Sequence, residues 1–151
     1  MLKEPDVQNI LRWDKEQRFR ASFFINSLLS QTIKIAIGEE TPTAGAVQTG
    51  YGFKIVNGAL SGISANGTSE TVLDLGTTLS TTASWDIEAR FSPGRNIIFF
   101  VNEVERGLIN TNLPSSNATL LHNDFLNVWI KTNEAVAKRM DITYFEYIQK
   151  R

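Results

Sequence analysis

Two acidic residues, Asp86 and Glu88, stand two positions apart in the segment Trp85–Phe91. Residues i and i+2 of a β-strand point to the same face, about 7 Å apart. A pair of carboxylates can cleave a glycosidic bond, one acting as acid and the other as base or nucleophile. The same pattern also suits an ordinary solvent-exposed strand face, which Arg90 would share. We favour this second interpretation and expect the protein to be no enzyme.

Metal and cofactor chemistry finds little support in the sequence. There is one histidine, His122, and no cysteine, which excludes disulfides and both multi-histidine and thiolate zinc sites. Calcium would need several converging oxygen ligands, which loop residues could supply. These residues are Asn110, Asn112, Asn117, Asn123 and Asp124. Their spacing singles out no calcium loop, so we predict no metal and no cofactor.

The charge balance and hydropathy exclude two further classes of partner. Fifteen basic residues stand against sixteen acidic ones, and no Lys/Arg cluster precedes Lys150 and Arg151. Nucleic-acid binding, which needs a basic face, is therefore not expected. No apolar run reaches the length of a membrane span, and the first residues lack the apolar core of a secretory signal. We expect synthesis in the cytoplasm, with no membrane partner.

Apolar residues fall at every second position along most of the chain, in short runs separated by Gly, Asn, Ser, Thr and Pro. Such alternation is typical of half-buried antiparallel strands. The predicted strands are 18–25, 33–37, 51–55, 59–65, 70–75, 85–91, 96–101, 104–110, 126–132 and 140–149. Asn57-Gly58 predicts a tight type I′ hairpin. Residues 18–151 are therefore predicted to form one all-β domain, a two-sheet antiparallel sandwich with jelly-roll-like topology.

Residues 1–17 are predicted to form a short helical arm. Val7, Ile10 and Leu11 follow helical spacing after Pro5, but their apolar stripe is too short to be stable alone. The arm must therefore pack on another surface, either its own sandwich or a neighbouring subunit. Trp13 would be its anchor, since aromatic side chains carry much of the binding energy at interfaces. These four apolar residues are our predicted partner contacts.

The order of these pieces resembles the concanavalin A-like, laminin-G-type β-sandwich of many phage virion proteins. The resemblance rests on five segments: Gly50–Phe53, Trp85–Ala89, Ile98–Asn102, Gly107–Pro114 and Met140–Tyr147. It implies a capsid decoration, head-fibre or tail-associated protein that is located in the virion. Such a protein would act through contacts with other virion proteins or as a homo-oligomer. This is the main functional prediction from the sequence.

Two alternatives remain open. The domain could be a carbohydrate-binding module that stacks sugars on exposed aromatic side chains, for which Tyr51, Trp129 and Tyr147 are the candidates. It could also be a glycoside hydrolase of the concanavalin A-like superfold, which carries a Glu-x-Asp-x-x-Glu pattern on one strand. Here that pattern reads Ser84, Asp86 and Ala89. Both outer glutamates are missing, so hydrolysis is the least favoured function.

Overall fold

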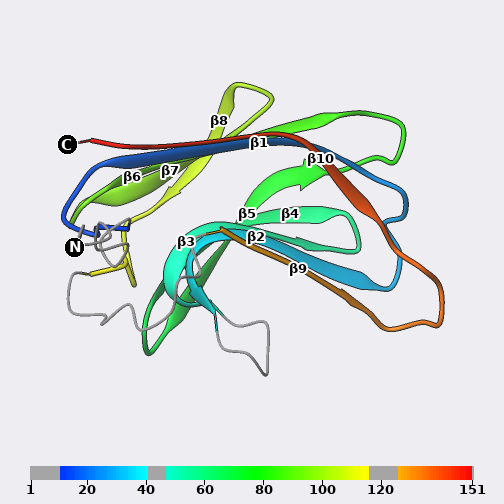
Figure 1. The fold of residues 1–151 in the computed structure, drawn as a ribbon, viewed down its shortest axis with the longest axis horizontal. Coiled ribbons are helices and arrows are strands. Elements are labelled where there is room, and N and C mark those ends of the chain that lie inside the picture. The colour runs from blue at the N-terminus through cyan, green and yellow to red at the C-terminus, as the bar shows by residue number, and fades with distance from the viewer. Residues whose placement is uncertain (1–10, 41–46, 116–125, 151) are drawn as a thin grey trace, which may run out of the picture.

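Ten β-strands make up two sheets in the part of the chain that the computed structural model describes, residues 11–40, 47–115 and 126–150. The sheets stack face to face (Figure 1). All neighbouring strands pair antiparallel, as the alternating sequence predicts. The described residues include no helix with the length and apolar character that a membrane crossing requires.

Each sheet has five strands. Sheet A has the order β10 (Met140–Gln149), β1 (Gln17–Ile25), β6 (Trp85–Ser92), β7 (Asn96–Val101) and β8 (Val104–Ile109). Sheet B has the order β5 (Glu70–Thr78), β4 (Ala59–Asn66), β3 (Val47–Val56), β2 (Gln31–Glu40) and β9 (Leu126–Thr132). The predicted all-β, two-sheet antiparallel sandwich is thereby confirmed.

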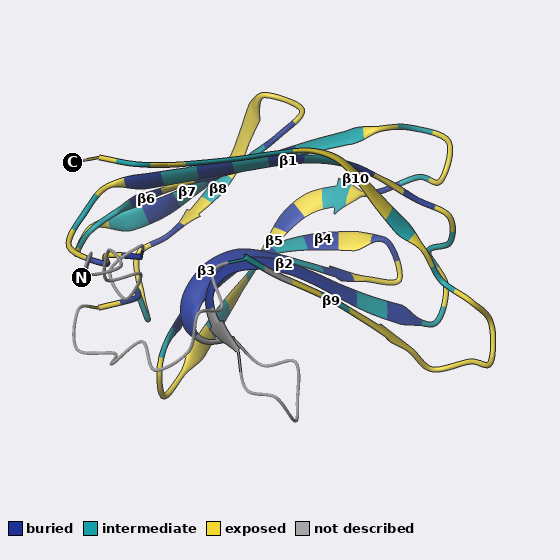
Figure 2. Ribbon diagram, in the orientation of Figure 1, coloured by how far each residue is buried: buried dark blue, intermediate teal, exposed yellow. Residues whose placement is uncertain are grey.

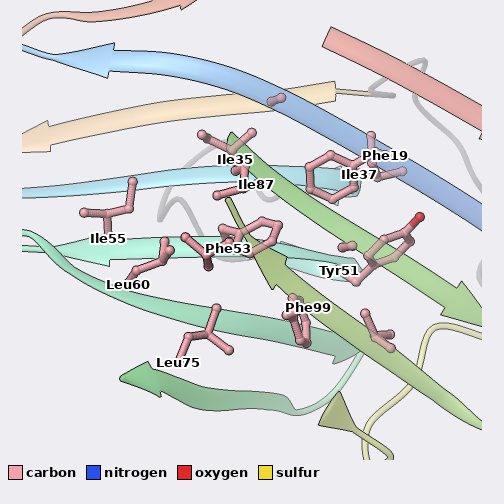
Figure 3. Close-up of a cluster of buried hydrophobic side chains, with 14 of the residues drawn as sticks. Phe19, Ile35, Ile37, Tyr51, Phe53, Ile55, Leu60, Leu75, Ile87 and Phe99 are labelled. Carbon is pink, nitrogen blue, oxygen red and sulfur yellow. The ribbon is translucent and has the colours of Figure 1, made fainter. Parts of the chain in front are cut away.

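The core lies between the sheets, where the buried positions of both face each other (Figure 2). Aromatic rings make up much of it (Figure 3). Phe53 of β3 meets Phe99 of β7 edge-on, with ring centroids 5.3 Å apart. Tyr51 stacks on Phe91 of β6 at 5.4 Å. On β6 the side chains of Ile87 and Phe91 point into this core, so Asp86 and Arg90 belong to the outer face of sheet A.

Two tight turns use left-handed backbone conformations. Asn57 and Gly58 have φ values of 49° and 87°, as the predicted type I′ hairpin between β3 and β4 requires. Asn102 and Glu103, between β7 and β8, have φ values of 48° and 66°. Glu103 thus takes a conformation that glycine adopts more easily. The turn carries its side chain to the rim of sheet A's outer face.

The predicted N-terminal helix is not confirmed: residues 11–16 contain a turn and a bend before β1 and no helix. Leu11 and Trp13 are 7% and 4% exposed and belong to the core of their own domain. Both side chains therefore pack on their own sandwich, one of the two surfaces that the sequence leaves open, and the contact with a partner stays a prediction. Val7 and Ile10 lie outside the described residues. An apolar stripe of two turns gives little helical stability, so tertiary packing of Trp13 decides the local structure.

Candidate functional site

The outer face of sheet A, which points away from sheet B, carries three cross-strand rows of side chains. The strand register defines them. The first row contains Ile148, Arg18, Arg90, Ile98 and Leu108. The second row contains Glu146, Arg20, Glu88, Phe100 and Glu105. The third row contains Tyr144, Ser22 and Asp86. Opposite charges therefore alternate across the middle of this face.

Ion pairs between the rows fix the arginines of β1. Arg20 Nε lies 2.9 Å from both carboxylate oxygens of Asp86, and Ser22 Oγ donates to Asp86 Oδ2 at 2.9 Å. The hydrogen bond to Asp86 raises the pKa of Arg20. Arg18 donates to Glu146. These contacts hold each guanidinium in one orientation over the sheet.

Glu88 is the least exposed charged group on this face. The residue is 8% exposed, and within the described part of the chain its hydrogen-bond partner is Arg90 alone. The Arg90 guanidinium also lies 4.2 Å from the centroid of the Phe100 ring, a cation–π contact. One bond from Arg90 leaves most of the acceptor capacity of the Glu88 carboxylate unused. The sequence-based interpretation of this residue as a solvated surface charge is therefore wrong.

Two adjoining hollows lie over these rows. The charged hollow has a volume of about 220 Å³ and is lined by Arg18, Arg20, Asp86, Glu88, Arg90, Phe100 and Glu103. Its three arginines balance its three carboxylates. The apolar hollow has a volume of about 330 Å³ and is lined by Glu16, Gln17, Arg18, Arg90, Phe91, Ser92, Ile98, Ile148 and Lys150. Arg18 and Arg90 line both hollows, which therefore lie side by side, and we call the two together the groove.

The three aromatic residues proposed from the sequence do not come together. Tyr51 is fully buried, and its hydroxyl donates to Gln17 Oε1 at 3.2 Å, so it is no exposed stacking platform (Figure 3). Burial also raises the pKa of Tyr51 well above its ordinary value. Trp129 is half-buried and pairs with Lys34 at the edge of sheet B. Tyr147 is half-buried on β10, opposite the core residue Phe19.

Of the loop residues considered as calcium ligands, Asn112 already uses its side chain in hydrogen bonds. Asn112 donates through Nδ2 to Thr71 Oγ1 at 2.9 Å and accepts through Oδ1 from Asn66 Nδ2 at 3.2 Å. Its side chain therefore ties the end of β8 to sheet B. No group of three or more His, Asp or Glu residues among those described could hold a metal ion. Asn117, His122, Asn123 and Asp124 lie outside the described residues.

The ion pair of Arg18 with Glu146 predicts acid sensitivity. The hydrogen bond from Arg18, followed by that from Tyr144, lowers the pKa of Glu146 below its ordinary value of 4.5. A folded-state pKa below the unfolded one contributes stability that is full above about pH 4.5 and is lost as pH falls through the folded value. At pH values below this, we expect the melting temperature to decrease as the pH is lowered. Glu146→Gln should make this decrease smaller. Glu105→Gln, at an exposed carboxylate outside these pairs, is the control; an equally smaller decrease in both variants would contradict the assignment.

Comparison with known proteins identifies the fold but no family. No protein-family model matches the sequence, and no curated protein matches it either. The binding domain of botulinum neurotoxin serotype D/C superimposes with a TM-score of 0.59 at 12% identity, over 90% of this chain and 33% of that one. A structure of botulinum neurotoxin type C superimposes with a TM-score of 0.58 at 12% identity, over 88% of this chain and 32% of that one. Cell entry of that toxin is described as dependent on two ganglioside molecules. A galectin of Caenorhabditis elegans gives 0.55 at 17% identity, over 94% and 87%.

These likenesses show the fold alone, a two-sheet antiparallel β-sandwich that the chain shares with these three structures. The chain spans about a third of the length of the two neurotoxin structures, but most of the length of the galectin. None of these three structures is a component of a virus particle, so they lend no support to the virion interpretation.

Proposed function

We propose that this domain is a non-enzymatic carbohydrate-binding module whose glycan occupies the charged hollow on the outer face of sheet A. The observation that carries the proposal is Glu88. This residue is 8% exposed in the wall of the hollow, and among the described residues Arg90 alone donates a hydrogen bond to its carboxylate. Burying a charge with few hydrogen bonds is costly, so a ligand that supplies donors is favoured there.

Sugar hydroxyls fit the rest of the wall as well. Each hydroxyl both donates and accepts, and the hollow offers carboxylates next to guanidinium groups that are held in place by ion pairs. Equal numbers of positive and negative groups favour a neutral ligand over an anionic one. The galectin and the ganglioside-dependent neurotoxin show that a sandwich of this fold can serve glycan binding, which supports the proposal. At this low identity the likeness itself concerns the fold alone.

Hydrolysis is not part of the proposal. Both oxygens of Asp86 accept from Arg20, and Ser22 adds a third bond, so this carboxylate is occupied by positioning the arginine. We expect no release of reducing sugar from any bound glycan. The virion-assembly function stays a prediction from the sequence, and a defined oligomer that binds no glycan would favour it.

The test compares two isosteric substitutions. The purified protein is screened on an array of neutral glycans, and the strongest ligand is titrated by calorimetry into wild type, Glu88→Gln and Glu105→Gln. A hydrogen bond to a charged group contributes roughly 1.5–3 kcal/mol, so we expect Glu88→Gln to bind about tenfold to a hundredfold more weakly. Glu105 is exposed on the same face but outside both hollows, so Glu105→Gln should bind as wild type does. Absence of any array signal, or equal weakening by both variants, would overturn the proposal.

A further inference from the structure

The apolar hollow next to the proposed glycan site is lined in part by apolar side chains, which offer sugar hydroxyls no hydrogen-bond partners. Ile148 and Ile98 stand at the two sides of Arg18 and Arg90 in one cross-strand row. The Arg18 guanidinium turns to Glu146 and the Arg90 guanidinium to Glu88, both in the neighbouring row. The aliphatic stems of the arginines therefore remain with the isoleucines, as long charged side chains commonly pack.

The three cations in the wall of this hollow are all paired with carboxylates. At its end, Lys150 pairs with Glu16, and the backbone of Lys150 donates to the Glu16 carbonyl at 2.9 Å. Arg18 and Arg90, the other two cations of the wall, are paired as well. An anionic substituent would thus find each cation already neutralised. The surface of Ile148, which is 47% exposed, instead favours an apolar occupant.

We propose that the apolar hollow binds an alkyl chain carried by the glycan in the charged hollow, so that the groove recognises an alkyl glycoside or the start of a glycolipid chain. This inference rests on the proposed function. It follows from the adjacency of the two hollows. Arg18 and Arg90 line both, so an alkyl chain on a sugar that contacts Glu88 would cross these two side chains to reach Ile98 and Ile148.

The test uses methyl and octyl β-D-glycosides of glucose, galactose and mannose, kept below the concentration at which the octyl compounds form micelles. Calorimetry measures their Kd for wild type, Ile148→Ser and Leu108→Ser. Leu108 is the matched control, because it ends the same row with the same exposed fraction of 47% and lines neither hollow. We expect the octyl glycoside to bind wild type and Leu108→Ser at least tenfold more tightly than the methyl glycoside. In Ile148→Ser this advantage should fall below threefold while methyl-glycoside affinity stays unchanged.

The outcomes separate the two proposals. If neither the methyl nor the octyl compounds bind, this inference is overturned, whereas the proposed function is overturned only if the glycan array also gives no signal. If methyl and octyl compounds bind equally and Glu88→Gln weakens both, the glycan site stands and the alkyl subsite is overturned. An octyl advantage that Ile148→Ser retains also overturns the subsite. Because both substituted residues are exposed, thermal melts should show folded variants in each case.

Discussion

Ile87→Asp should abolish cooperative folding of the domain. Ile87 is fully buried between the sheets, with Ala21 of β1 and Val101 of β7 beside it in the register. An aspartate there would place an unpaired carboxylate among apolar side chains, at a cost of several kcal/mol. Domains of this size have about 5–15 kcal/mol of total stability, so the loss is comparable to the whole. Circular dichroism and a thermal melt check it.

Leu108→Asp is the control for this prediction, since it introduces the same charge on the outer face of the same sheet. That side chain is 47% exposed and should accept the substitution with a cooperative melt. If Ile87→Asp were soluble and melted cooperatively, β6 would have its faces reversed. Asp86 and Glu88 would then point into the core, and the charged hollow could not exist.

Strand positions could be predicted from the sequence because side-chain alternation is a local property. The segment 85–91 was expected as a strand, and β6 spans Trp85–Ser92. The sequence also predicts that Tyr51 is buried, because Tyr51 alternates with glycines and shares a strand face with Phe53 and Ile55. This pattern places Tyr51 in the core, against the prediction of an exposed sugar platform.

The candidate site could not be predicted in the same way, because it depends on pairing between distant strands. Arg18 and Arg20 alternate with the core residue Phe19, so their outward direction was readable. Their position beside Asp86 and Glu88 follows from the pairing of β1 with β6, which joins residues far apart in the sequence. That pairing also decides the burial of Glu88, since neighbours on β1 and β7 cover its sides.

Trp13→Ala should be strongly destabilising. The indole is 4% exposed and meets the rings of Tyr51 and Phe91 edge-on, at centroid distances of 6.1 and 5.8 Å. Removing a buried tryptophan costs about 3–5 kcal/mol through lost burial and the cavity that remains. For a domain of this length that corresponds to a drop of roughly 6–20 °C in Tm. Differential scanning calorimetry measures it.

Two further variants separate packing from other effects of this segment. Arg12→Ala removes an exposed side chain whose ion-pair partner, Asp14, is also exposed, so it should change stability by less than about 0.5 kcal/mol. Trp13→Phe should recover much of the loss, because it keeps an aromatic ring and removes an indole Nε1 that is buried without a hydrogen-bond partner among the described residues. Equal melting temperatures for Trp13→Ala and Arg12→Ala would mean that Trp13 does not hold the N-terminal segment to the core. The sequence-based prediction of an arm that binds another subunit would then become the better account of this residue.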